Sequence, residues 1–177
     1  MMRRFLAAIG LAASLSAPLP AEALVSIDAF EAVHTALLAV WEELPLTVRN
    51  VTLTTQNATG YGDYTPYEGK RVEIGQTIHV YVEVLGYGWK DNGDGTLSEL
   101  LEADLNLVDA SGAVVASQAK FLTADIRSRH RLLETYLTLE ATLTDFAAGE
   151  YILRYVLHDA AAGKQTEFDV PVTLVAP

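Results

Sequence analysis

The sequence predicts an all-β protein, an antiparallel sandwich of seven strands with one helix before it. Apolar and polar residues alternate over several short segments, the pattern of strands with one buried face and one solvated face. Glycine-rich turn signals separate these segments, so most neighbouring strands are expected to form hairpins. Only residues 24–44 contain helical spacing, and they precede the sandwich predicted at 45–177. Seven strands joined in this way are typical of two packed antiparallel sheets.

The alternation is clearest near the C-terminus, where Leu153, Tyr155 and Leu157 share one face of a strand. The predicted strands lie at 46–55, 78–84, 101–107, 113–121, 137–144, 151–157 and 168–174. The alternation changes phase at Arg49 and Asn50. This change indicates a β-bulge in the first strand.

Composition and charge exclude several classes of function. The chain has 177 residues, 12 Lys and Arg, 23 Asp and Glu, a formal net charge of -11 and no Cys. This length can bury a core without disulfides, and the lack of Cys excludes thiol catalysis and cysteine metal sites. An acidic surface repels phosphate groups, so nucleic acid is not an expected partner. No cofactor is expected either, because no glycine-rich phosphate loop joins a strand to a helix.

Residues 1–23 have the pattern of a secretory signal peptide. An arginine pair at 3–4 is followed by the apolar run 5–15, which is too short to span a bilayer, and by the small-x-small cleavage pattern at 21–23. The mature chain is expected to begin near Leu24, and it is not expected to insert into a membrane after the signal peptide is cleaved. We therefore expect a bacterial periplasmic or secreted protein.

Asp28 is expected to cap the helix, with Glu31 completing a capping box and Pro45 ending the helix. Apolar residues recur at helical spacing and form one side of it: Phe30, Val33, Leu37, Val40, Trp41 and Leu44. We expect this side to lie on the sandwich and to cover an end or an edge. The alternative is a helix that binds a partner or a second copy of the chain.

The chain resembles a group of uncharacterised secreted bacterial proteins built on an immunoglobulin-like or fibronectin type III-like β-sandwich. The segments that carry this resemblance are Gly60–Tyr64, Val80–Tyr87, Ala103–Leu107 and Gly149–Asp159 with Gly163-Lys164. The corner at Asp145–Tyr151 also resembles the corner before the penultimate strand of such sandwiches, where a Tyr hydroxyl bonds to upstream backbone. The resemblance implies a seven-stranded immunoglobulin-like sandwich and implies no activity.

The candidate ligand-binding site is a set of aromatic residues in irregular, glycine-rich sequence. Its members have no obvious place in the core pattern: Tyr61, Tyr64, Tyr67, Tyr87 and Trp89. Rings on loops can stack on a ligand while their polar tips hydrogen-bond, as carbohydrate and peptide surfaces require. The expected partner is an envelope protein, a peptide or a glycan, and the expected state is a monomer or weak homo-oligomer. The alternative is that these rings pack beneath a long loop.

Two further segments are weaker candidates. Arg127, Arg129 and Arg131 concentrate positive charge and suggest an anion-binding site, although pairing with nearby carboxylates is the alternative. The segment 91–102 resembles the middle of an EF-hand loop. Neither possible frame supplies the full ligand set, so we expect a plain hairpin loop and no metal site, with weak ion binding as the alternative.

Catalytic signals are sparse. His79 and Glu83 share a predicted strand face, but four residues along a strand place them ~13 Å apart. The neighbours His158-Asp159 and Ser128-x-His130 lack the spacing of a nucleophile, base and orienting group. We expect no catalytic residues and a non-catalytic binding or scaffold module. The alternative is a structural protein that assembles through its helix or an edge strand, and a hydrolase built around His79, Glu83 or His158 is least expected.

Overall fold

The computed structural model describes residues 26–177, which form one helix followed by nine strands. The elements are α1 (Ile27–Glu43), β1 (Thr47–Thr54), β2 (Arg71–Glu73), β3 (Thr77–Leu85), β4 (Lys90–Asp91), β5 (Leu97–Asp109), β6 (Val114–Ser128), β7 (Thr135–Thr142), β8 (Gly149–Asp159) and β9 (Lys164–Val175). The predicted signal peptide at 1–23 lies outside the described residues.

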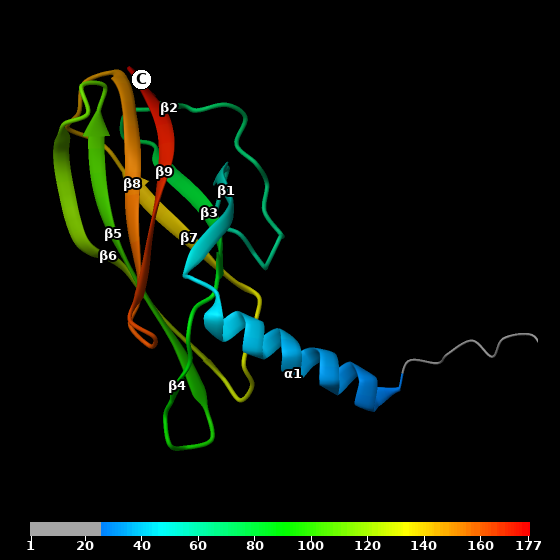
Figure 1. The fold of residues 1–177 in the computed structure, drawn as a ribbon. Coiled ribbons are helices and arrows are strands. Elements are labelled where there is room, and N and C mark those ends of the chain that lie inside the picture. Colours follow the sequence, from blue (N-terminus) through cyan, green and yellow to red (C-terminus); the bar gives the residue numbers. More distant parts are fainter. Residues whose placement is uncertain (1–25) are drawn as a thin grey trace, which may run out of the picture.

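The strands form two sheets (Figure 1). The small sheet has the order β1-β3-β7 and is antiparallel, while the large sheet has the order β2-β9-β8-β5, with β4 and β6 both pairing with β5. β2 pairs with β9 in parallel. The predicted all-β class with one helix is confirmed. The predicted count of seven strands is wrong, because β2 and β4 are too short to show alternation, and the immunoglobulin-like arrangement is not confirmed.

Buried residues of both sheets form one core cluster. Leu153, Tyr155 and Leu157 on β8 are buried and alternate with half-buried residues, as the sequence predicts. The bulge in β1 is also confirmed, because Asn50 has a φ of 52° and the β1–β3 register shifts between Arg49 and Thr52.

The corner before β8 has the predicted hydrogen bond. The Tyr151 hydroxyl donates to the backbone oxygen of Ala147 at 3.1 Å. This contact ties the loop after β7 to the start of β8.

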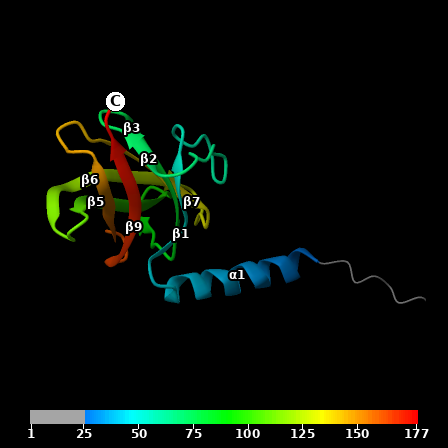
Figure 2. The same cartoon turned by 90° about the horizontal axis from the view of Figure 1, so that it is seen from above.

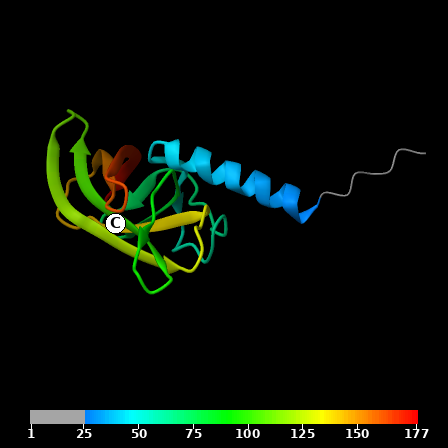
Figure 3. The ribbon, with the colours of Figure 1, turned by 60° about the horizontal axis from the view of Figure 1, so that its bottom comes forward.

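Helix α1 does not lie on the sandwich. Figures 1, 2 and 3 show it extending away from both sheets, and Trp41 is its buried residue. Its N-cap is Ser26, whose Oγ accepts a hydrogen bond from the Ala29 amide at 3.1 Å, in place of the predicted Asp28. The expected packing of the helix on the sandwich is therefore wrong.

The polar outer face of the large sheet is an unfavourable support for the apolar side of α1. Arg154 donates from two nitrogens to Asp169 at 2.9 Å, and His158 pairs with Asp104 on the same sheet. An apolar helix side gains nothing by covering such polar and charged groups, because their hydration would be lost.

Candidate functional site

Helix α1 carries most of the large apolar side chains that are exposed in residues 26–177. The α1 patch consists of Ile27, Phe30, Val33, Leu37 and Val40, with exposed fractions of 69%, 58%, 69%, 46% and 64%. The two other such residues, Val114 and Val115, lie on β6. Single exposed apolar side chains are common in proteins, but a contiguous patch marks an interaction surface.

The α1 patch occupies one side of the helix. Successive residues of an α-helix are rotated by about 100°, which places the five side chains within a sector of about 140°. Asp28, Glu31 and Glu42 lie outside this sector. The helix is therefore amphipathic, with an exposed apolar side and an acidic side.

The last turn of α1 is anchored to the body through Trp41. This side chain is 6% exposed, and its Nε1 donates to the backbone oxygen of Tyr87 at 2.9 Å. Its ring centroid lies 5.2 Å from that of Tyr87 and 6.1 Å from that of Trp89. The guanidinium of Arg131 lies 5.3 Å above the Trp89 ring, a cation–π distance.

Lys164 fixes the C-terminal end of the helix. Its Nζ donates to the backbone oxygens of Glu42, Leu44 and Gly86 at 3.1, 2.8 and 2.8 Å. The final carbonyls of a helix have no intrahelical partner and carry partial negative charge, so an ammonium group satisfies them well. Arg131 adds an ion pair with the Glu42 carboxylate at 2.6 Å.

Gly86 allows the loop after β3 to approach the linker that follows α1. It has a φ of 73°, and a Cβ at this position would lie 2.4 Å from the backbone oxygen of Pro45. Only glycine tolerates both the conformation and the contact. The direction of α1 is therefore set by a packed junction made of Trp41, Lys164 and Gly86.

The five predicted aromatic site residues do not form one exposed surface. Tyr87 is 1% exposed, and its hydroxyl lies 2.9 Å from both the Leu132 oxygen and Thr135 Oγ1. It is buried because it fills the space beside Trp41. Trp89 is half-buried in the same junction.

Tyr61 and Tyr64 belong to a separate group on the small sheet. The Tyr61 hydroxyl donates to Glu83 Oε2 at 2.9 Å, and the Tyr64 ring lies 4.3 Å from the ring of the buried Tyr81. Tyr67 is half-buried against the core. The predicted alternative, in which these rings pack beneath a long loop, describes this group better than a binding surface does.

Glu83 is the centre of this second group. It is buried and accepts a hydrogen bond from Arg49 Nε at 2.7 Å. Burial alone would raise the pKa of Glu83, but hydrogen bonds from Asn50, Arg49 and two tyrosine hydroxyls together lower it. The loop at 56–67 is thus tied to the sheet by satisfied polar contacts.

The predicted arginine group is dispersed among acidic partners. Arg127 Nε lies 3.8 Å from Asp125 Oδ2, and Arg131 pairs with Glu42. Arg129 is exposed. The pairing alternative therefore describes Arg127 and Arg131.

The catalytic candidates lie on different sheets. His79 and Glu83 are on β3 of the small sheet, where His79 Nδ1 lies 2.8 Å from Asn57 Oδ1, while His158 on β8 pairs with Asp104. Among residues 26–177, no three His, Asp or Glu side chains are grouped closely enough to hold a metal ion. Asp91 and Asp94 accept hydrogen bonds from Gly93 and Thr96 in the turn between β4 and β5. The hairpin loop is shorter than the predicted segment 91–102, because residues 97–102 belong to strand β5.

Glu99 is a notable residue that was not selected from the sequence. It is 2% exposed, Thr135 Oγ1 donates to its Oε2 at 2.6 Å, and its Oε1 has no hydrogen-bond partner among the described residues. Burial raises its pKa to about 7. The sequence pattern could have identified it, because Glu99 lies two residues before Leu101 and so shares the buried face of the strand. Through Thr135 it connects to Tyr87, beneath the α1 junction.

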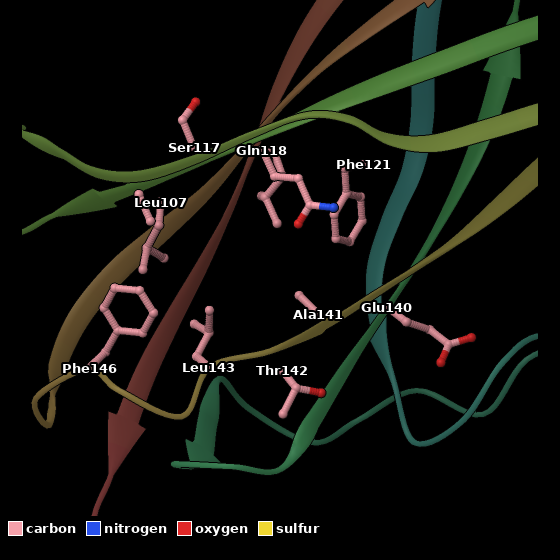
Figure 4. Close-up of a pocket in the computed structure, with 11 residues that line it drawn as sticks. Leu107, Ser117, Gln118, Phe121, Glu140, Ala141, Thr142, Leu143 and Phe146 are labelled. Atoms are coloured by element: carbon pink, nitrogen blue, oxygen red, sulfur yellow. The ribbon is translucent and has the colours of Figure 1, made fainter.

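A cleft of about 380 Å³ opens between the two sheets, where β5 and β6 face β7 (Figure 4). Its apolar lining includes Leu105, Leu107, Phe121, Leu143 and Phe146, and its polar lining includes Ser117, Gln118, Glu140 and Thr142. This volume is near the lower end of the range for small-molecule sites. The cleft is therefore a second candidate site.

No protein-family model and no curated protein matches the chain. Solved structures with some similarity include a Niemann-Pick type C2 protein from Japanese carpenter ant, with a TM-score of 0.44, 11% identity, and coverage of 75% of this chain and 94% of that chain. The CARDB domain of a Pyrococcus furiosus protein, in complex with di-metal ions, has a TM-score of 0.35, 15% identity and coverages of 73% and 87%.

The Pseudomonas fluorescens alkylpurine DNA glycosylase AlkC, bound to DNA, has a TM-score of 0.41 and 9% identity. The match covers 74% of this chain and only 30% of AlkC. All three TM-scores are below 0.5, so these similarities establish neither a shared family nor a function. In the described residues, no helix combines the length and the apolar character that crossing a membrane requires.

Proposed function

We propose that this protein is a non-catalytic interaction module of the bacterial periplasm or exterior, and that the α1 patch is its contact surface for another protein chain. One observation carries this proposal. The molecule anchors the last turn of α1 with Trp41 and Lys164 and leaves five large apolar side chains of the same helix exposed.

The free-energy balance favours a covered patch. Full burial of a large apolar side chain contributes about 1.5–3 kcal/mol. Burial of the five exposed side chains in an interface would therefore contribute a large favourable free energy to association. An isolated helix of this length is marginally stable in water, and a partner that covers its apolar side would also stabilise it.

The packed junction gives the patch a fixed direction. A contact surface that is already ordered loses less conformational entropy on binding than a flexible tail does. Trp41, Lys164 and Gly86 therefore serve the interaction by holding α1 away from the sheets.

The cleft between the sheets supports a second candidate function, the binding of a small apolar molecule. Phe121 and Phe146 would provide rings beside an apolar floor, and Gln118 and Glu140 would provide polar groups at the rim. The cleft is open and small, so we rank it below the α1 patch. We do not propose a glycan or peptide site at the aromatic residues, because Tyr87 is buried and Tyr61 is bonded to Glu83.

Site-specific photo-crosslinking in a producing bacterium tests the proposal. A benzoylphenylalanine in place of Val33, on the patch, should yield a discrete adduct with another protein chain. The matched control carries the same group in place of Thr35, which is exposed on the acidic side of α1. Equal labelling from both positions, or none from Val33, would contradict the proposal.

A further inference from the structure

The apolar residues of α1 have the spacing of a coiled-coil contact line. Phe30, Val33, Leu37 and Val40 follow one another at intervals of three, four and three residues, and the half-buried C-cap residue Leu44 comes four residues later. This is the alternation of a and d positions in a heptad repeat, which brings one helix against another along its length. We call the four helical residues, Phe30, Val33, Leu37 and Val40, the α1 seam. The natural occupant of such a seam is a helix with the same spacing.

The residues beside the seam are compatible with self-pairing. Ala29 and Ala36 lie along one border, which ends at Glu43, and allow a second helix to approach closely, while the other border holds His34 and the buried Trp41. Asp28 and Glu42 occupy the side farthest from the seam, at the outer positions of the heptad. Two copies can therefore join their seams without placing these carboxylates in contact.

We propose that the α1 seam pairs with the α1 seam of a second copy of this chain, with the two helices antiparallel. The proposal rests on the proposed function, since it names the partner of the same surface. A symmetric antiparallel pair places Phe30 opposite Val40 and Val33 opposite Leu37. The two-fold axis then crosses the interface midway between the Val33 and Leu37 positions.

The charge of the protein favours the antiparallel orientation. Each chain has a formal net charge of -11, and the sandwich is attached at the C-terminal end of α1. A parallel pair would bring the two acidic sandwiches side by side. An antiparallel pair separates their attachment points by the helix length of about 25 Å, well beyond the screening length of ~8 Å at physiological ionic strength. It also places each helix N-terminus near the opposite C-terminus, which aligns the helix dipoles favourably.

The size of the patch indicates a weak dimer. A patch of five side chains exposes on the order of 500 Å². Two such patches would bury roughly 1,000 Å² in total, which is close to the lower limit for a specific interface. We therefore expect dissociation in the micromolar range.

A membrane surface is a poorer occupant of the seam. Amphipathic helices that bind anionic membranes carry Lys and Arg on their polar side. Between Ile27 and Glu43 the charged residues are all acidic: Asp28, Glu31, Glu42 and Glu43. This charge opposes adsorption to anionic lipid.

Sedimentation equilibrium tests the self-association. The exported protein, with its N-terminus determined by mass spectrometry, is compared with Val33→Glu and with Thr35→Glu. The two variants add the same charge to the same helix on opposite sides. We expect Val33→Glu to raise the dimer dissociation constant at least about tenfold, and Thr35→Glu to change it less than about twofold. Equal effects of the two variants would overturn the proposal.

Crosslinking tests the orientation on a clean background, because the chain has no cysteine. Ala36→Cys lies beside the proposed axis, and a short bis-maleimide should link two copies. Phe30→Cys lies about 15 Å from its counterpart in an antiparallel pair and should not be linked. Efficient linking through Phe30→Cys alone would overturn the antiparallel arrangement.

Failure of this inference can be distinguished from failure of the proposed function. If the protein is monomeric at all concentrations and the Val33 photo-crosslink has a mass other than twice that of the chain, the partner is a different protein and the self-pairing is wrong. If Val33 yields no adduct of any mass, the proposed function fails as well. Salt provides a further check, since pairing of acidic copies should persist after a tenfold rise in NaCl, whereas binding to a basic partner should weaken.

Discussion

Helix α1 and the loop at 56–67 each differ from what their sequences indicate, and in opposite directions. The loop, with Tyr61 and Tyr64 among glycines, was expected to present rings to a ligand, yet its tyrosines bond and stack on the small sheet. The helix was expected to pack on the sandwich, yet its apolar side is exposed. Periodicity shows which side of a helix is apolar. It does not show whether that side is covered by the same chain.

The largest expected effect is a difference in stability between substitutions at the anchored end of α1 and on its exposed patch. Trp41→Ala should lower the free energy of unfolding by about 3–5 kcal/mol, because it removes a buried ring from the junction. Phe30→Ala, on the exposed patch, should change it by less than about 0.5 kcal/mol. Urea unfolding followed by far-UV circular dichroism measures both. Similar losses in the two variants would mean that the patch is packed in the folded monomer.

The next effect is the pH dependence of stability that Glu99 contributes. Glu99 has a folded-state pKa of about 7, above its ordinary value, so the folded protein retains a proton that the unfolded chain releases. The associated stability is complete below the ordinary pKa and is lost as the pH rises toward about 7. Glu99→Gln should therefore be more stable than the parent protein at pH 8, by about 2 kcal/mol, and this advantage should disappear near pH 4.5.

Thermal unfolding of both proteins at several pH values measures this difference. Glu102→Gln, on the same strand but half-buried, is the matched control. A constant offset between Glu99→Gln and the parent across the pH range would show that Glu99 does not titrate in this way.

A smaller effect tests whether hydrogen bonding holds the loop at 56–67 against the small sheet. Tyr61→Phe removes the hydroxyl that bonds to Glu83 and should cost about 1 kcal/mol, with faster proteolytic cleavage within 56–67. Tyr136→Phe is a suitable control, since the Tyr136 ring stacks on Tyr81 in the same group. If Tyr61→Phe leaves both stability and cleavage unchanged, the loop is free to present its rings.

The smallest effect is local to the start of α1. Ser26→Ala should weaken the first turn by about 0.5–1 kcal/mol through loss of the N-cap. Hydrogen exchange of the amides near Phe30 should accelerate, while exchange in β3 stays the same. Acceleration throughout the sandwich would instead mean that the first turn is coupled to the core.

Local patterns in the sequence predicted where the long strands lie and the bulge at Asn50, because each depends on neighbouring residues, and the resemblance to a known corner implied the hydrogen bond of Tyr151. The patterns missed residues 97–100 of β5 and 122–128 of β6. The site depends on contacts between distant segments. Trp41 meets Tyr87 and Trp89 only after the fold has formed, so its helical spacing alone could not separate an anchor from an exposed neighbour. Glu99 was detectable in principle, since its alternation with Leu101 places a carboxylate on a buried face.

The contact between Lys164 and the end of α1 has a consequence for the order of folding. Lys164 is the first residue of β9, the last strand in the chain, and it bonds to Leu44 near the start of the described residues. During synthesis, the helix emerges long before this lysine does. Its final direction is therefore fixed only when the C-terminal strand has paired with β8. In the proposed assembly, a partly folded chain would present the α1 patch without the orientation that Lys164 fixes, so pairing of β9 would have to precede stable association.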